Sequence, residues 1–154
     1  MQYSEIRNKI DRTEMDSYAK RQYLLLSLLR DNEDDDITLQ QCLNICGDNP
    51  FWEIVVLERM IKPELTETDT EDLFMEIDKL ITELDAYTTD RFRKFKKVRR
   101  ELAIVEEKRA IYLESIDRDQ AIEALKKAAS LISFDPATVE VLKTEIGEME
   151  RADE

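Results

Sequence analysis

The chain has 154 residues, of which 36 are acidic and 23 basic, giving a formal net charge of −13, and it contains no histidine. A net charge of this size disfavours non-specific binding of the whole molecule to nucleic acid or to an anionic membrane, and so favours protein partners. Without histidine the chain lacks the commonest general base, metal ligand and activator of a serine or cysteine nucleophile. We therefore expect a non-enzymatic protein that uses no cofactor and no metal.

Composition also predicts the fold class. Apolar residues make up 42% and charged residues 38% of the chain, and only two glycines and three prolines are present. Few obligate turns and many helix-forming residues are typical of an all-α protein. The N-terminus has no apolar core of the signal-peptide type, and no apolar run approaches the roughly 20 residues of a membrane span. We expect a soluble, cytoplasmic protein.

We predict one domain over residues 1–154, because this length supports a single continuous core. The expected architecture is a bundle of six or seven helices with a long antiparallel helical hairpin. Its three parts are N-terminal helices in 1–62, the hairpin in 68–114 and a C-terminal helix pair in 117–150.

The N-terminal part begins with an amphipathic pattern over 15–30, followed by the acidic run DNEDDD at 31–36. That run has the composition of a calcium-binding loop, but Asp36 stands where such a loop needs glycine and Cys42 where it needs a bidentate glutamate. We expect a solvated acidic loop. In the short helix predicted next, at 38–46, Cys42 and Cys46 share an apolar face, which favours reduced, buried thiols.

A nearly all-apolar helix is predicted over 51–61, with Asn49 as its cap and Pro50 in its first turn. Two short helices meeting near Gly47 invite comparison with a DNA-binding helix-turn-helix. Phe51 and Trp52, however, stand where base-reading polar side chains are needed. The helix is better interpreted as the buried centre of a bundle.

The hairpin is predicted from two apolar seams at helix-packing spacing, joined by the short link 88–90. Thr68 and Glu71 match a capping box that starts the first arm. The first seam consists of Leu73, Ile77, Leu80, Leu84 and Tyr87, and the second of Phe95, Val98, Leu102, Val105 and Tyr112, with Arg109 as its charged interruption. If these seams were exposed they would pair between two copies of the chain, so a homodimer through 73–84 and 95–112 is a secondary hypothesis.

The second arm opens with the candidate binding surface, which we call the basic stripe. It consists of Arg91, Arg93, Lys94, Lys96, Lys97, Arg99 and Arg100. Three interpretations stay open: charge pairing with the acidic first arm at 67–90, binding to an acidic protein partner, and binding to nucleic acid, with Phe92 and Phe95 stacking on bases.

The acidic residues suggest two further hypotheses. The carboxylates at 31–36 and 67–78 would let the protein imitate the phosphates of a duplex and block a nucleic-acid-binding protein. Paired acids on helices could also hold Mg²⁺, but Glu64 and Glu67 lie in a linker, and Glu145 and Glu148 lie close to the expected frayed end. We favour an adaptor or inhibitor that binds a protein partner through charged helical surfaces.

In the C-terminal pair, Asp117 is predicted to cap one helix, and Asp135 with Pro136 to start the last. Tyr112, Ala121, Leu125 and Ala128 fall at the intervals of a tetratricopeptide repeat, so the stretch 102–137 resembles that family, and the resemblance implies a peptide-binding groove. Pro136 arrives about three residues later than in the family pattern, and no second copy is found. A generic helical hairpin accounts for the spacing equally well. The family's tryptophan, leucine and glycine positions are occupied by Val105, Lys108 and Arg109.

Overall fold

The computed structural model describes residues 8, 20, 24–27, 29–30, 36–46, 49–87 and 96–152. Within these residues the chain forms helices and no strands, which confirms the predicted all-α fold class. The acidic run 31–35, Gly47, the link 88–90 and three cations of the basic stripe (Arg91, Arg93 and Lys94) lie outside the described residues, as does most of the helix predicted over 15–30.

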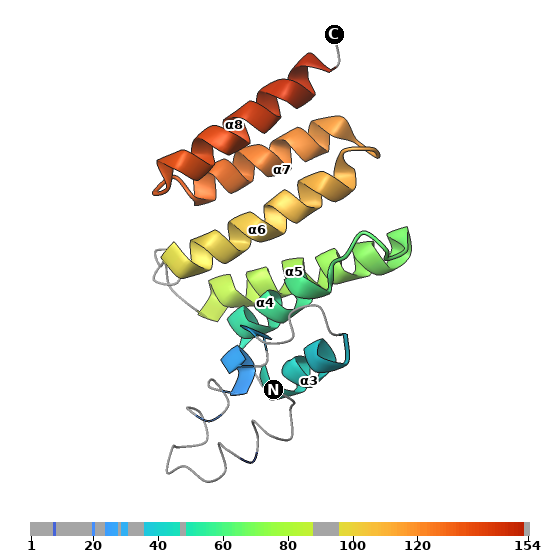
Figure 1. The fold of residues 1–154 in the computed structure, drawn as a ribbon, viewed down its shortest axis with the longest axis vertical. Helices are drawn as coiled ribbons and strands as arrows, with labels where there is room; N and C mark the ends of the chain where they lie inside the picture. The colour runs from blue at the N-terminus through green and yellow to red at the C-terminus, as the bar shows by residue number, and fades with distance from the viewer. Residues whose placement is uncertain are drawn as a thin grey trace. The chain divides into compact units, whose positions relative to one another are not determined.

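From residue 36 onward, six helices with defined bounds follow one another in the described part of the chain (Figure 1). They are α3 (Asp36–Cys46), α4 (Pro50–Met60), α5 (Glu67–Tyr87), α6 (Lys96–Leu113), α7 (Arg118–Leu131) and α8 (Pro136–Arg151). None of the described helices combines the length and the apolar character needed to cross a bilayer.

The chain divides into two compact units, Met1–Glu83 and Leu84–Glu154, called here the first and second units. The predicted hairpin has one arm in each unit, so the pairing of its arms stays a prediction, as does the single domain. Apolar residues in both seams are nevertheless buried, as their spacing requires. They are Ile77, Leu80 and Leu84 in α5 and Val98, Leu102 and Val105 in α6.

In the first unit, α3 and α4 pack around one apolar cluster. Asn49 caps α4 as predicted, because its side-chain oxygen accepts hydrogen bonds from the backbone N–H groups of Phe51 (3.1 Å) and Trp52 (3.3 Å), with Pro50 in the first turn. Most of α4 is buried, which agrees with its predicted central place. The cluster consists of Leu24, Leu25, Leu29, Leu39, Cys42, Cys46, Trp52, Val55 and Val56.

The two cysteines are free and buried, as predicted. Burial raises the pKa of Cys42 to about 11 and that of Cys46 to about 12. Since the thiolate is the reactive form, we predict that neither thiol reacts with a disulfide reagent at pH 8 in the native protein, and that both react at once in denaturant. Rapid native labelling of either cysteine would show that the α3–α4 cluster opens readily.

The start of α5 differs from the prediction. The helix begins at Glu67, and the hydroxyl oxygen of Thr66, not that of Thr68, accepts the hydrogen bond from the backbone N–H of Asp69 (3.1 Å). Thr66 also accepts, through its carbonyl, from the hydroxyl of Thr70 (2.9 Å), a residue that is itself buried. The residue that caps the start of the helix is therefore a threonine two residues before the capping-box match. The sequence pattern alone could not show which of the two threonines is the cap.

The second unit contains the end of α5 followed by α6, α7 and α8; α7 is antiparallel to α6, and α8 is antiparallel to α7 (Figure 1). The predicted caps at both reversals are confirmed: Asp117 accepts from the N–H of Gln120 (3.2 Å), and Asp135 accepts from the N–H of Thr138 (3.3 Å). Alanines dominate the core, and such small side chains let helix axes approach closely. The buried cluster is Ala103, Ala110, Ala121, Ala124, Leu125, Ala128, Ile132 and Leu142.

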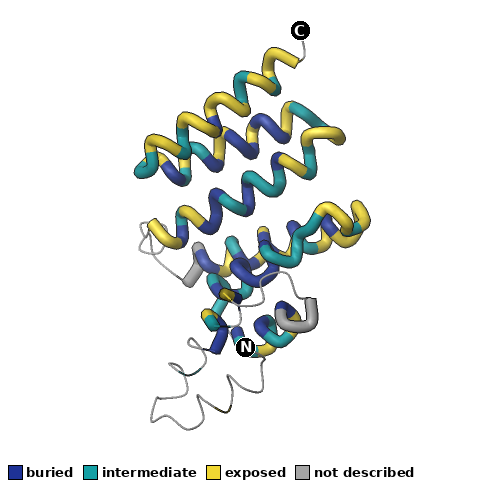
Figure 2. Tube along the Cα trace, in the orientation of Figure 1, coloured by how far each residue is buried: buried dark blue, intermediate teal, exposed yellow. Residues whose placement is uncertain are grey.

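Buried and exposed residues alternate along the sequence of each helix in this unit. The buried residues form a stripe along one face of α6 and of α7, whereas α8 is mostly exposed (Figure 2). Leu142 is the one described residue of α8 that is fully buried, and it anchors that helix to the cluster. Arg109, the charged interruption of the predicted α6 seam, pairs with Glu106 across 3.4 Å. The fold thus places α7 between two helices that run in the same direction.

Candidate functional site

A groove opens in the second unit between α6 and α8, with α7 behind it. Because α7 is antiparallel to both neighbours, α6 and α8 are parallel, and their groove-facing residues keep the same register. Each helix contributes residues at i, i+3, i+4 and i+7, which lie on one helical face and span about 10 Å along the axis. We call this the acidic groove; its walls are Glu107, Ala110 and Ile111 of α6 with Glu114 directly after that helix, and Glu145, Glu148 and Met149 of α8 with its C-cap residue Ala152.

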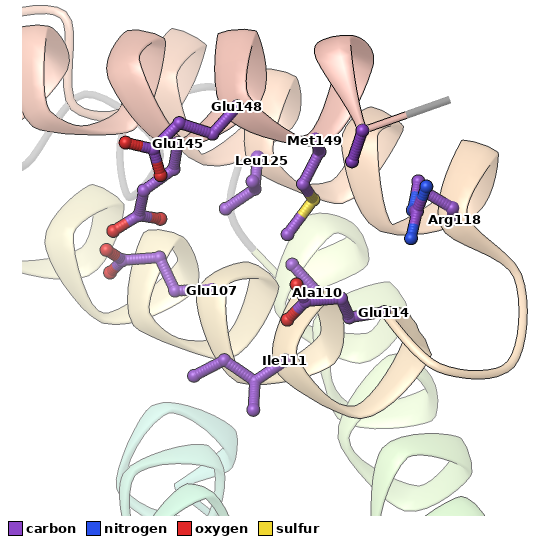
Figure 3. A pocket seen from close by; sticks show the side chains of 10 residues that line it. Glu107, Ala110, Ile111, Glu114, Arg118, Leu125, Glu145, Glu148 and Met149 are labelled. Carbon is purple, nitrogen blue, oxygen red and sulfur yellow. The ribbon is translucent and has the colours of Figure 1, made fainter. Parts of the chain in front are cut away.

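The groove has a volume of about 370 Å³ and differs in character along its length (Figure 3). At one end the carboxylates of Glu107 and Glu145 point toward one another, with Glu148 beside them. Met149 lies in the middle, in front of the buried Leu125 of α7. The groove therefore has a negatively charged end and an apolar centre.

The opposite end of the groove is electrically mixed. Glu114, directly after the end of α6, and Arg118, at the start of α7, line it together. In total the lining has four carboxylates and one guanidinium. The excess negative charge is thus concentrated around Glu107 and Glu145.

The charge arrangement perturbs Glu107. Burial, and next the nearby carboxylate of Glu145, raise the pKa of Glu107 above its usual value. Both causes disfavour the charged form of the side chain. A cation placed between the two carboxylates would offset their mutual repulsion. The groove therefore favours a positively charged ligand.

Apolar surface accompanies this charge. Ile111, on the α6 wall, is 71% exposed, and Met149 lines the α8 wall. A single exposed isoleucine is common on protein surfaces. Here it adjoins the groove, whose apolar centre is formed by Met149 and Leu125, so a ligand side chain placed there would contact those two residues.

The acidic groove does not have the arrangement of a metal centre. Among the described residues, no group of three or more cysteine, aspartate or glutamate side chains is placed to hold a metal ion. Glu145 and Glu148, considered above as a magnesium pair, lie within α8, which continues to Arg151. Their carboxylates face Glu107 from across the groove.

The described part of the basic stripe contacts its own unit. Lys96, Arg99 and Arg100 surround the ring of Phe134 in the α7–α8 turn, with their charged groups 5.6, 5.5 and 5.3 Å from its centroid. These are distances at which cations are attracted to an aromatic face. The fourth described cation, Lys97, is exposed.

Hydrogen bonds strengthen the same contact. Arg99 donates to the carbonyl of Ser130 (3.1 Å) and to the hydroxyl of Ser133 (3.2 Å), and Arg100 donates to Asp135 (3.3 Å). Hydrogen bonds from Thr138, and then the guanidinium of Arg100, lower the pKa of Asp135. The α7–α8 turn was not among the predicted targets of the stripe, and partner binding by the stripe stays a prediction.

We predict that Phe134→Leu weakens this contact while keeping apolar volume in the turn. Loss of the ring attraction for three cations should lower the free energy of unfolding by about 1–2 kcal/mol. Thermal unfolding followed by circular dichroism measures the change. An unaltered midpoint would show that the hydrogen bonds from Arg99 and Arg100 hold the turn without help from the ring.

The sequence identified only part of the groove. Glu145 and Glu148 were noted as paired acids, whereas Glu107 was missed. A usable signal was present, because α6 and α8 both carry glutamates at i and apolar residues at i+4 along one face. That signal becomes informative only once α6 and α8 are known to be parallel neighbours across α7.

Three of the four tetratricopeptide-like positions are buried in this unit, and the fourth, Tyr112, is half-buried. Ala121 and Ala128 are fully buried and Leu125 nearly so, at the surface where α7 packs on its neighbours. Any closely packed helical hairpin buries small residues in this way, so the burial adds no weight to the resemblance. Comparison with known proteins finds no match to a family model, a curated protein or a solved structure. The functional assignment therefore depends on the groove's own geometry and charge.

Proposed function

We propose that this chain is a non-enzymatic interaction protein that binds a positively charged segment of a protein partner in the acidic groove. The observation that carries the proposal is the pairing of Glu107 with Glu145 across a concave site whose centre is apolar. In the unbound protein these carboxylates repel one another in a partly desolvated position, which costs free energy. A bound cation would offset that cost, while its segment buries apolar surface.

A protein segment fits the groove better than a nucleic acid does. The phosphates of a nucleic acid would approach the carboxylates around Glu107 and be repelled. A protein segment can place a basic and an apolar side chain next to each other, which matches the charged end and the apolar centre of the groove. Charge complementarity also accelerates association and makes the binding sensitive to salt.

Nucleic-acid binding by the basic stripe is the alternative function. The experiment described below distinguishes it from peptide binding in the groove. It would use Lys96 and Lys97 at the start of α6. Substitutions of the groove carboxylates leave both of these cations intact. From Lys96 to Glu107 is eleven residues, or about 16 Å along the helix, so ligands bound at the two places would perturb different residues. Binding at the stripe would weaken steeply with salt as counterions are released.

The test is selection of random peptides displayed on phage against the full-length protein. The groove variant is Glu107→Gln with Glu145→Gln, and a charge-matched control variant is Glu123→Gln with Glu140→Gln. The control acids are exposed and pair with Lys126 and Lys143 at 3.6 Å, outside the groove lining, so their loss should cost little stability.

We expect the selected peptides to be cationic, to bind the control variant as they bind the natural protein, and to bind the groove variant at least about tenfold more weakly. Backbone NMR shifts on binding should map to residues 107–114 and 145–152, the two walls of the groove. Peptides that bind both variants equally, or failure to select any peptide, would overturn the proposal. Salt-labile binding of RNA or DNA that shifts Lys96 and Lys97 instead would favour the nucleic-acid alternative.

A further inference from the structure

We infer that the acidic groove recognises a short extended segment in which an arginine and a large apolar side chain stand two residues apart. The inference rests on the proposed function and specifies the ligand. It follows from the length of the groove, the order of its charged and apolar parts, and the placement of two carboxylates on opposite walls.

The size of the groove favours an extended chain. Its walls are matched over seven residue steps of α6 and α8, or about 10 Å, and its volume is about 370 Å³. A helix with side chains is about 10–12 Å across, too wide to enter such a space between two parallel helices. An extended chain advances about 3.3 Å per residue, so about three residues cover the matched walls.

The order of the lining sets the spacing. Glu107 is four residues before Ile111 on α6, and Glu145 is four residues before Met149 on α8, so on each wall the apolar residue lies about 6 Å beyond the carboxylate. In an extended chain, residues i and i+2 point to the same side and are roughly 6–7 Å apart. A basic side chain at i and an apolar one at i+2 would therefore reach the two parts of the groove together.

The opposed carboxylates favour arginine over lysine. Glu107 belongs to α6 and Glu145 to α8, and their carboxylates point toward one another (Figure 3). A guanidinium carries several donors in a planar fork and can bond to two carboxylates at once. A lysine ammonium is a compact, strongly hydrated charge that gains less from this geometry. The mixed end at Glu114 and Arg118 offers no comparable preference for one sign of charge.

The probes are fluorescein-labelled peptides of one composition that differ in spacing. The core Ser-Arg-Ser-Leu-Ser places arginine and leucine two apart, and permuted cores place them one and three apart. Two further peptides replace arginine by lysine or by the uncharged citrulline, and one replaces leucine by alanine. Binding to the full-length natural protein, the groove variant and the control variant is measured by anisotropy and NMR titration at low salt.

We expect the two-apart peptide to bind about fivefold or more tightly than the other spacings, and its lysine version several-fold more weakly. Citrulline should weaken binding about tenfold in the natural protein and the control variant but less than about twofold in the groove variant, since the two changes remove the same interaction. Alanine in place of leucine should remove the shifts at Met149.

The outcomes distinguish this inference from the proposed function. Equal binding of all spacings, with affinity still lost in the groove variant, would overturn the spacing rule and leave the groove as a site for basic segments. Equal affinity for arginine and lysine would overturn the two-carboxylate contact. Equal binding to all three proteins would overturn both the inference and the proposed function.

Discussion

Replacing Leu142 by alanine is expected to lower the free energy of unfolding by about 2–5 kcal/mol, the cost of emptying a well-packed leucine site. Leu142 is 0% exposed and belongs to the alanine-rich cluster of the second unit. Small neighbours such as Ala121, Ala124 and Ala128 have no long side chains to move into the space. Incomplete relaxation around the cavity places the expected cost in the upper part of that range.

The neighbouring residue supplies the control. Val141 is on the same helix but 58% exposed, so Val141→Ala should change the free energy of unfolding by less than about 0.5 kcal/mol. Denaturant unfolding followed by circular dichroism compares the two variants. Hydrogen exchange should show the loss of protection in α8 first, because no other described residue of that helix is fully buried. Equal effects of the two substitutions would contradict the anchoring role of Leu142.

The same substitution links stability to the site. One wall of the acidic groove is α8 and the other is α6, and α7 packs against both of them. If α8 loosens, the carboxylates of Glu145 and Glu148 no longer hold their place opposite Glu107. Leu142→Ala should therefore also weaken peptide binding, although Leu142 does not line the groove.

Local features of the fold could be predicted because each depends on a few neighbouring residues. Three helices start where the sequence indicates: at Asn49 with Pro50, at Asp117, and at Asp135 with Pro136. In each case a short polar side chain before an apolar periodic run accepts hydrogen bonds from backbone N–H groups of the first turn. Thr66 was the exception, because two nearby threonines offered the same chemistry. The all-α class followed from composition and periodicity.

The candidate site was less predictable because it depends on how distant segments meet. Glu107 and Glu145 are separated by 38 positions in the numbering and face one another only because α7 lies between their parallel helices. The basic stripe was conspicuous in the sequence, whereas the contact of Arg99 and Arg100 with the α7–α8 turn depends on a reversal far along the chain. A dense run of charge is visible locally, but a sparse pair across a groove is not.

Replacing Glu107 by glutamine is expected to make the protein more stable at pH 7 and a weaker binder. The pKa of Glu107 is raised in the folded state, so between its unfolded value, about 4.3, and its folded value the native protein binds more protons than the unfolded chain. Stability contributed by this group is therefore present at low pH and is lost as the pH rises through that window. Glutamine keeps the size of the side chain and removes the charge that burial and Glu145 oppose.

The expected gain at pH 7 is a few tenths of a kcal/mol, up to about 1 kcal/mol, or roughly 1–4 °C in Tm for a chain of this length. The gain should shrink as the pH falls through that same window and be gone below about 4, where the carboxyl group is neutral in both the folded and the unfolded chain. Thermal unfolding of the natural protein, Glu107→Gln and the control Glu140→Gln at pH 7 and pH 3.5 measures both effects. The control lies on α8 outside the groove lining and should give no gain.

Opposite changes in stability and binding would identify the charge of Glu107 as one maintained for a ligand at the expense of the fold, a relation common at binding and catalytic sites. If Glu107 served only the fold, its replacement would lower stability and leave binding unchanged. A variant that is less stable at pH 7 would contradict the repulsion from Glu145. A more stable variant with undiminished peptide affinity would place the bound cation elsewhere in the groove, nearest to Glu114 or Glu148, the two carboxylates that line it beside Glu107 and Glu145.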